Sequence, residues 1–174
     1  MNKSLLFALC LIILVGCGQK KSATEDQAEK NKALNAQVYD YFNTDNWDKL
    51  TSLIASDFVD HNPDPGQKQG FDGLKEAFAQ MRKAYPDFKI TVNHMVAEGD
   101  YVCSHVTVTG TNTGEMNGMP PTGKKMSIEG FDLIRISNGK GVERWGVFDT
   151  MTMLTQLGMM PQQGQQPPAE SNKK

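Results

Sequence analysis

The sequence predicts an α+β domain in which three helices precede a meander of antiparallel strands and a short helix follows. Two observations support this prediction. Up to Tyr85, apolar residues recur at helical spacing, and from Asp87 onward they alternate with polar residues at the period of a strand. A run of helices followed by a run of strands is typical of the α+β class. The length of 174 residues suits one such domain with short appendages.

Three amphipathic segments predict the helices. The first begins at Thr24, which forms a capping box with Gln27 three residues later. Pro86 ends the third, because proline cannot continue a helix. The apolar residues on the three helical faces are Leu34, Val38, Tyr41 and Phe42, then Trp47, Leu50, Leu53 and Ile54, then Leu74, Ala77, Phe78, Met81 and Tyr85.

Alternating segments predict the strands that follow. A turn at Glu98-Gly99-Asp100 and a tight hairpin at Asn138-Gly139 separate neighbouring strands. The last strand runs to Asp149, and residues 151–157 form a short helix that ends at Gly158. The apolar residues that share a face of the first three strands are Phe88, Ile90 and Val92, then Val102, Val106 and Val108, then Met126, Ile128, Ile134 and Ile136.

The amino terminus predicts export. Lys3 precedes an apolar run over residues 5–15 that is too short to span a bilayer as a helix, which is typical of a signal peptide. Leu14-Val15-Gly16-Cys17 at its end resembles the lipobox of bacterial lipoproteins. That resemblance implies cleavage before Cys17 and acylation of its thiol and new amino group with fatty acids such as palmitate. An ordinary secretory signal that contains a cysteine is the alternative.

The chain therefore divides into four parts. We expect a signal peptide over residues 1–16, a lipidated tether over 17–23, a folded domain over 24–160 and a disordered, Gln- and Pro-rich tail over 161–174. Two or more acyl chains would anchor the protein stably to a membrane. By the same resemblance, Gly18 after the cysteine implies an outer-membrane lipoprotein facing the periplasm if the host has two membranes.

Charge and cysteine content limit the functional classes. The formal net charge is −2 and the body of the chain has no basic run, so we expect no nucleic-acid partner. Cys103 is the only cysteine outside the amino-terminal segment, which rules out a disulfide within the domain. His61, His94 and His105 are too widely spaced to predict a zinc site.

The segment over residues 110–149 resembles the SnoaL-like polyketide cyclase and ester cyclase family. The resemblance lies in the turn Gly110-Thr111-Asn112-Thr113-Gly114, in Pro120-Pro121-Thr122-Gly123-Lys124 and in Trp145-Gly146-Val147-Phe148-Asp149. His61-Asn62-Pro63 also recurs in ester cyclase-like members. The resemblance covers about residues 38–158 and implies the nuclear transport factor 2-like fold. In that fold a strongly curved antiparallel sheet wraps over the helices to form a cone with an internal pocket.

The family also suggests catalytic residues. In these cyclases the acid/base carboxylate lies four residues after a strand tryptophan, which corresponds to Asp149 after Trp145, and no metal or organic cofactor is used. Trp145, Val147 and Asp149 share one strand face, so we expect them in the pocket, together with Glu129 and Phe131 of the preceding strand. Burial against Trp145 would raise the pKa of Asp149.

Each of these assignments has a structural alternative. Asp149 could instead cap the terminal helix. Glu129 could be a surface charge. His61, beside Asp60, could be an acid/base group or a hydrogen-bonded residue at a turn. Many ester cyclase-like members carry histidine where this chain has Asn112, and asparagine cannot titrate, so we expect no acid/base role there.

Three functions are compatible with this pattern. The first is a cofactor-independent cyclase, isomerase or hydrolase acting on a small hydrophobic carbonyl compound. The second is a non-catalytic module that binds a small apolar ligand at the cell envelope. The third is a dimeric interaction lipoprotein. The family implies homodimers, and a half-polar strip on one strand offers a contact surface, made of Tyr101, Cys103, His105 and Thr107.

The lipobox makes a prediction of its own. Wild-type protein should fractionate with membranes and partition into detergent, and Cys17→Ser should abolish lipidation because serine lacks the thiol that accepts the diacylglyceryl group. Mass spectrometry of the mature amino terminus measures both. An unmodified Cys17 in mature wild-type protein would contradict the prediction.

Overall fold

The computed structural model describes residues 23–116 and 118–160. The predicted signal peptide, the lipidation of Cys17, the tether up to residue 22 and the tail over residues 161–174 lie outside the described residues. Within them, no helix is both long enough and apolar enough to cross a membrane.

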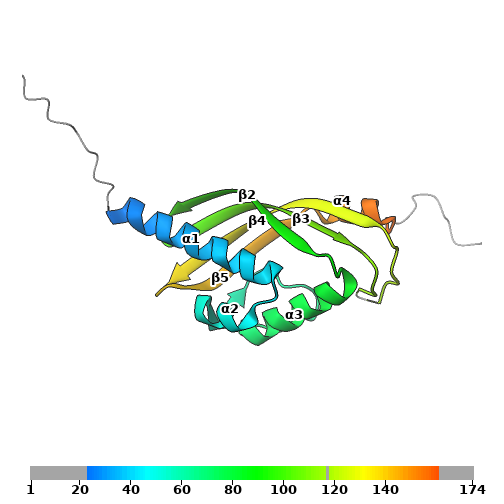
Figure 1. The fold of residues 1–174 in the computed structure, drawn as a ribbon, viewed down its shortest axis with the longest axis horizontal. Coiled ribbons are helices and arrows are strands. Elements are labelled where there is room, and N and C mark those ends of the chain that lie inside the picture. Colours follow the sequence, from blue (N-terminus) through cyan, green and yellow to red (C-terminus); the bar gives the residue numbers. More distant parts are fainter. Residues whose placement is uncertain (1–22, 117, 161–174) are drawn as a thin grey trace, which may run out of the picture.

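The domain is a curved five-stranded sheet with helices packed on it (Figure 1). The elements in chain order are α1 (Ala23–Asn43), α2 (Trp47–Leu53), β1 (Ile54–Asp60), α3 (Gly70–Ala84), β2 (Lys89–Glu98), β3 (Tyr101–Thr111), β4 (Lys125–Ser137), β5 (Lys140–Phe148) and α4 (Thr150–Leu157). α1 packs on β2 and β3, α3 on β1, and α4 on β4. The predicted α+β class is confirmed.

The sheet is mixed, which corrects the expectation of a purely antiparallel meander. Its strand order is β1-β5-β4-β3-β2, and β1 pairs with β5 in parallel while the other neighbours are antiparallel. The predicted second helix extended to Ile54, but Ile54 begins β1, on which Phe58 and Asp60 are buried. Phe58 and Asp60 are two residues apart, which is the period at which side chains of a strand return to the same face. Because β1 has only seven residues, few of its side chains are buried.

The first helix also begins differently from the prediction. α1 already includes Ala23, so Thr24 lies in its first turn and does not precede it as a cap. The hairpin at Asn138-Gly139 is confirmed, since β4 and β5 pair across it and both residues have positive φ, 51° and 73°. Positive φ at two successive residues is the geometry of the tight hairpin turn that Asn-Gly favours.

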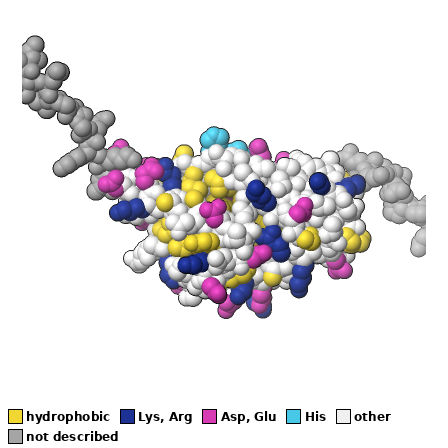
Figure 2. All heavy atoms as spheres, in the orientation of Figure 1, with side chains coloured by type: hydrophobic (Ala, Val, Ile, Leu, Met, Phe, Trp, Pro, Cys, Tyr) yellow, Lys and Arg dark blue, Asp and Glu magenta, His cyan; other side chains and the backbone are white. Residues whose placement is uncertain are grey.

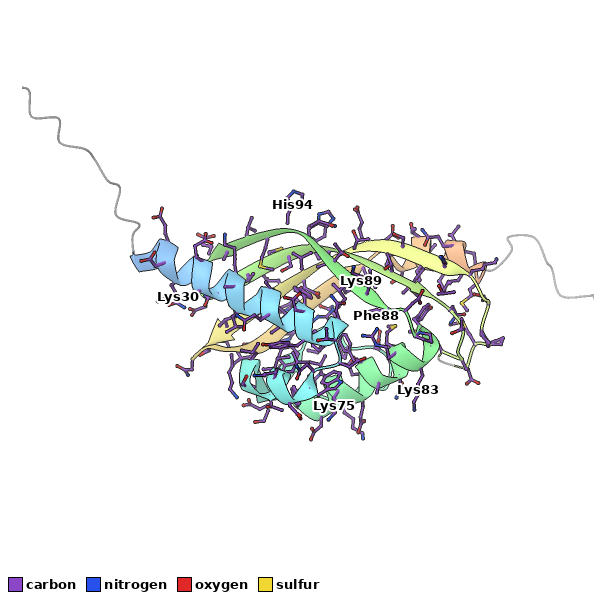
Figure 3. All side chains as sticks on the ribbon, viewed as in Figure 1. Lys30, Lys75, Lys83, Phe88, Lys89 and His94 are labelled. Atoms are coloured by element: carbon purple, nitrogen blue, oxygen red, sulfur yellow. The ribbon has the colours of Figure 1, made fainter. Side chains whose placement is uncertain are left out.

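The hydrophobic core lies between the helices and one face of the sheet. The rings of Phe42 and Phe78 stack with centroids 4.1 Å apart, and Trp47 packs edge-on against both Phe71 and Phe78. These contacts join α1, α2 and α3 into one layer. In Figure 3, Lys75 and Lys83 project from α3 toward solvent, and Phe88, which is buried, lies at the start of β2 beside this layer.

The two faces of the sheet differ in burial. On the inner face, toward the helices, β4 carries Met126, Ile128 and Asp132, all buried. The outer face carries large apolar side chains in contact with solvent: Val147 is 63% exposed and Phe131 49%. His94 also projects outward from β2 (Figure 3). The side of the molecule in Figure 2 shows basic and acidic side chains interspersed, with no extended patch of one sign.

Candidate functional site

A cavity of about 490 Å³ lies between the helices and the inner face of the sheet. Most of its lining is apolar and comes from α1, α3, the sheet and α4; representative residues are Leu34, Phe42, Leu74, Ile128 and Met153. This size and lining are typical of a site for a small organic molecule. Among the residues that the structure describes, the charged ones that line the cavity are Asp60, Asp64, Asp132 and Arg144.

Three of these charged residues form a buried triad, Asp60–Arg144–Asp132. Nε of Arg144 donates to Oδ1 of Asp132 at 2.7 Å, and Nη2 lies 2.7 Å from the same oxygen. Nη1 of Arg144 donates to Oδ2 of Asp60 at 2.9 Å. Asp60 is 3% exposed and Asp132 is 6% exposed. One guanidinium therefore compensates two carboxylates that water hardly reaches.

The carboxylate oxygens of the triad also accept hydrogen bonds from residues outside it. The hydroxyl of Tyr39 in α1 donates to Oδ2 of Asp132 at 3.2 Å. The backbone N–H of Asn62 donates to Oδ1 of Asp60 at 3.0 Å, and Nε2 of Gln67 donates to its Oδ2 at 3.3 Å. Each carboxylate oxygen thus accepts at least one hydrogen bond, as buried polar groups require.

Strand register brings the triad together. Asp60, at the end of β1, pairs directly with Arg144 on β5, and Asp132 on β4 pairs with Gly146, two residues beyond Arg144 on the same face. A Cβ atom at Gly146 would lie 2.7 Å from Oδ1 of Asp132 and closer still to the guanidinium of Arg144. Glycine at this position therefore leaves the space that the ion pair occupies.

The triad shifts the pKa values of its members. Burial raises the pKa of Asp132 above its ordinary value, and nearby Asp60 adds to the rise, although Arg144 and the hydrogen bond from Tyr39 oppose it. Burial disfavours the charged form of Arg144, but the two carboxylates outweigh this and raise its pKa. Burial and Asp132 raise the pKa of Tyr39 as well. Burial thus raises the pKa of the Asp132 carboxyl group in spite of its pairing with Arg144.

Asp149 lies outside this site. It is exposed and is the N-cap of α4, where Oδ1 accepts a hydrogen bond from the N–H of Thr152 at 2.9 Å. Bonds from the hydroxyl and N–H of Thr152 lower the pKa of Asp149, so the expected rise through burial is wrong. Asp149 therefore occupies the helix-capping position that was the alternative to a role in the pocket.

The pocket predicted from Trp145, Val147, Glu129 and Phe131 is on the wrong side of the sheet. These residues share a face, as the alternation indicated, but it is the outer one, and none of them lines the cavity. Glu129 is exposed, and its Oε2 lies 3.4 Å from Nε2 of His105. The inner face of β5 carries the residues that alternate with Trp145 and Val147, namely Arg144, Gly146 and Phe148.

His61 is also on the outer side. Its ring stacks on Trp145 with centroids 4.3 Å apart, and its Nε2 lies 2.8 Å from Oε2 of Glu143. His61 and Glu143 are solvent-accessible, and neither lines the cavity. The preceding residue, Asp60, lines the cavity, whereas His61 does not.

Asn112 has a structural position. It is fully buried, and its Oδ1 accepts hydrogen bonds from the N–H of Thr122 at 2.8 Å and from its hydroxyl at 3.1 Å. These bonds hold the two ends of the loop between β3 and β4 together. Within residues 23–116 and 118–160, no group of three or more His, Cys, Asp or Glu side chains is placed to hold a metal ion.

Four residues around the cavity were not predicted from the sequence as site residues: Asp60, Asp132, Arg144 and Tyr39. For Asp132, the sequence pattern contained a sign of its position. It lies in register with Ile128, Ile134 and Ile136, the aliphatic side of its strand, and a carboxylate among such residues has to be paired.

The capping position of Asp149 makes a testable prediction. Asp149→Ala should lower the thermal midpoint by about 2–4 °C, while Asp149→Asn should change it much less, because asparagine caps nearly as well as aspartate. Because the folded-state pKa is lowered, the ionic part of this stability is present above the ordinary aspartate pKa and is lost as pH falls through the lowered value. Thermal melts between pH 2 and pH 7 measure it. Equal losses in both variants would argue against the cap.

Comparison with known proteins supports the fold. TsrD from Streptomyces laurentii superposes with a TM-score of 0.69 at 22% identity, covering 76% of this chain and 97% of that one, a likeness of fold alone. IdmH, a candidate polyketide cyclase from Streptomyces antibioticus, has a TM-score of 0.66 at 31% identity and covers 74% and 98%. A candidate polyketide cyclase from Bacillus cereus ATCC 10987 has a TM-score of 0.69 at 25% identity and covers 82% and 89%.

No curated protein matches the chain. The family model described as SnoaL-like polyketide cyclase matches residues 32–157, a range that includes every element of the sheet and all members of the buried triad. The chain belongs to the SnoaL-like polyketide cyclase family and has its nuclear transport factor 2-like fold.

Proposed function

We propose that the cavity binds a small, mainly apolar carbonyl compound and that the protein isomerises, cyclises or hydrolyses it by acid/base chemistry without a cofactor. The observation that carries this proposal is Asp132. Its carboxyl group lines an apolar cavity, is nearly excluded from water and has a raised pKa. A perturbed carboxyl group inside a cavity is a candidate acid/base group. The candidate cyclase function of IdmH, at 31% identity, agrees with this class of reaction.

The proposed chemistry uses one proton. As a carboxylate, Asp132 takes a proton from an acidic carbon next to the substrate carbonyl, and an enolate forms. In a cyclisation, this carbon attacks a second carbonyl, a carbon–carbon bond forms, and protonated Asp132 returns the proton to the resulting alkoxide. Burial makes the carboxylate a stronger base, and Arg144 stabilises it whenever it is ionised.

A non-catalytic binding function is the second candidate. It is favoured by the saturation of the carboxylate oxygens: Asp132 is already engaged by Arg144 and Tyr39. In that case the triad would hold the cavity open and orient a ligand without exchanging a proton. Either function would operate at the cell envelope if Cys17 is lipidated, as the lipobox predicts.

Proton exchange distinguishes the two candidates. If Asp132 is the base, wild-type protein should accelerate exchange of the α-protons of 2-tetralone in D₂O, and Asp132→Asn should lower the protein-dependent rate by about 100-fold or more, the usual scale for such a group. Mass spectrometry follows deuterium uptake. Asp149→Asn, a change of the same kind outside the cavity, should keep the wild-type rate.

The pH dependence of this exchange should report Asp132. The rate should rise with pH through the raised pKa, because the ionised form is the base. Tyr39→Phe removes a hydrogen bond that lowers the pKa of Asp132, so the midpoint should move to higher pH. Thermal melts should first establish that the variants fold. A wild-type rate equal to that of buffer would leave the binding function, and a full rate in Asp132→Asn would exclude Asp132 as the base.

We also propose that the outer face of the sheet pairs with a second copy of the chain. It carries exposed apolar side chains on neighbouring strands, and Phe131 on β4 pairs with Val147 on β5. The strip predicted on β3 lies on this same face, since Val102 and Ser104 point inward between its members. Contiguous apolar surface of this kind is typical of an interaction site.

Light scattering tests the pairing. The full chain should be a dimer at micromolar concentration, and the double variant Phe131→Glu/Val147→Glu should be a monomer, because two buried charges on each subunit would oppose association. Lys83→Glu, on the exposed side of α3, is the matched control and should remain dimeric. A monomeric wild-type protein would refute the proposal.

A further inference from the structure

We infer that the cavity rejects carboxylates through Asp60 and Asp64, and that it prefers a ligand whose polar end is an uncharged hydrogen-bond acceptor over an anionic ligand of the same shape. This inference rests on the proposed function, in which the cavity is the ligand site. It adds the charge class of the ligand, and it assigns specificity to two residues that the proposed proton transfer does not use.

The cavity has an excess of negative groups. Among the described residues that line it, three are carboxylates, Asp60, Asp64 and Asp132, and one is a guanidinium, Arg144. Three negative charges against one positive charge leave a formal charge of −2 when all are ionised. No lysine or histidine of the described chain lines the cavity. A ligand carboxylate would therefore bring a further negative charge into a weakly solvated space that already holds an excess.

Arg144 does not restore attraction for an anion. Its contacts with Asp60 and Asp132 are 2.7–2.9 Å long and lie in the buried triad, so both partners already neutralise it. An anionic ligand that paired with Arg144 would have to share the guanidinium with two buried carboxylates. Leaving either carboxylate with less compensation is costly in a low-dielectric site.

Arg144 has unused donor capacity. A guanidinium carries five N–H groups. Nε donates to Asp132 and one N–H of Nη1 donates to Asp60, while Nη2 lies 2.7 Å from Oδ1 of Asp132 as an ion pair. Among the residues that the structure describes, no acceptor pairs with the second N–H of Nη1. Such a donor suits a carbonyl, ester or ether oxygen, which accepts a hydrogen bond without adding charge.

A cationic ligand is a separate case. Every oxygen of Asp60 and Asp132 already accepts at least one hydrogen bond, from Arg144, Tyr39, Gln67 or the N–H of Asn62. A carboxylate oxygen has two lone pairs, however, and an excess of carboxylates attracts a cation, so the charge selection of this cavity acts against anions. A neutral acceptor attached to an apolar body does not meet that repulsion.

Asp64 gives the selection a second, separable component. It lines the cavity in the loop after β1, is exposed, and binds Gln67 only through its backbone, since its N–H donates to Oε1 of Gln67 at 3.2 Å and its C=O accepts from the N–H of Gln67 at 2.9 Å. Replacing its carboxylate therefore removes a charge from the cavity without breaking a side-chain bond of the triad.

Three probes with one apolar body test the inference: 2-acetonaphthone, 2-naphthoate and 2-naphthylmethylammonium. Equilibrium dialysis of the full chain at pH 7 should show the neutral ketone binding at least about tenfold more tightly than the carboxylate, because one like charge a few ångströms away in a protein is worth that much. The ammonium should bind more tightly than the carboxylate, because its charge is opposite to the excess in the cavity.

Matched variants identify the cause. Asp60→Asn should raise the ratio of carboxylate affinity to ketone affinity by about tenfold, because it removes one unit of negative charge and little volume. Asp64→Asn should act in the same direction by a smaller factor, and it remains informative if Asp60→Asn fails to fold. Asp87→Asn removes an exposed carboxylate outside this cavity and should change neither affinity.

The outcomes separate this inference from the proposed function. Binding of the carboxylate as tight as, or tighter than, that of the ketone or the ammonium would overturn the charge selection while leaving the cavity as a ligand site. Variants at Asp60 and Asp64 that leave the preference unchanged would overturn their role. Absence of binding by all three probes would overturn the cavity as the site, and this inference with it. Acid/base chemistry fails separately, through the exchange of α-protons.

Discussion

The contact on which the site depends is the double pairing of Arg144. Its guanidinium joins β5 to β1 through Asp60 and to β4 through Asp132, so three strands meet at one buried cation. A buried ion pair is costly to form, but loss of one partner costs more, about 3–5 kcal/mol, because it leaves a charge uncompensated in a poor solvent. The triad therefore contributes to specificity of register: only the observed pairing of β1 with β5 places Asp60 opposite Arg144.

The triad also determines what kind of cavity this fold contains. Leu34, Phe42 and Ile128 would make a site for any apolar molecule, with affinity set by size. Adding a compensated charge cluster at one end converts it into a site with fixed dipoles, which remain oriented before a ligand enters. Gly146 belongs to the same arrangement, since a side chain there would occupy the position of the guanidinium. Cavity shape and cavity electrostatics thus depend on the same few strand positions.

Local patterns predicted most of the fold because most of it is encoded locally. The hairpin at Asn138-Gly139 and the helix ending before Pro86 need only neighbouring residues to specify them. β1 was missed because seven residues, of which few are buried, pair in parallel with a strand about 85 positions later, and no local pattern records such a partner.

The predicted site was misplaced for a related reason. Alternation divides β5 into two faces but does not indicate which face is inward, and the ring of Trp145 suggested the wrong one. The aliphatic side chains of Ile128 and Ile136, which are buried, could have identified the inner face of β4. The pairing of β4 with β5 would then have identified the inner face of β5.

The contrast between neighbouring residues shows why a family motif transfers a fold more readily than a catalytic role. Asp60 and His61 are adjacent, yet one faces the cavity and pairs with Arg144, whereas the other stacks on Trp145 on the opposite face. Phe148 and Asp149 differ in the same way: the first lines the cavity, and the second caps α4. A carboxylate near the end of a strand can face the cavity or can cap the helix that follows. The second position arises when the next residues already form the first turn of that helix. Here Thr152 supplies an N–H at 2.9 Å, so the carboxylate of Asp149 is drawn to the helix and acquires a lowered pKa. The carboxyl group with a raised pKa lies instead on β4, where burial excludes water from Asp132 and the paired Arg144 offsets part of the cost of that burial.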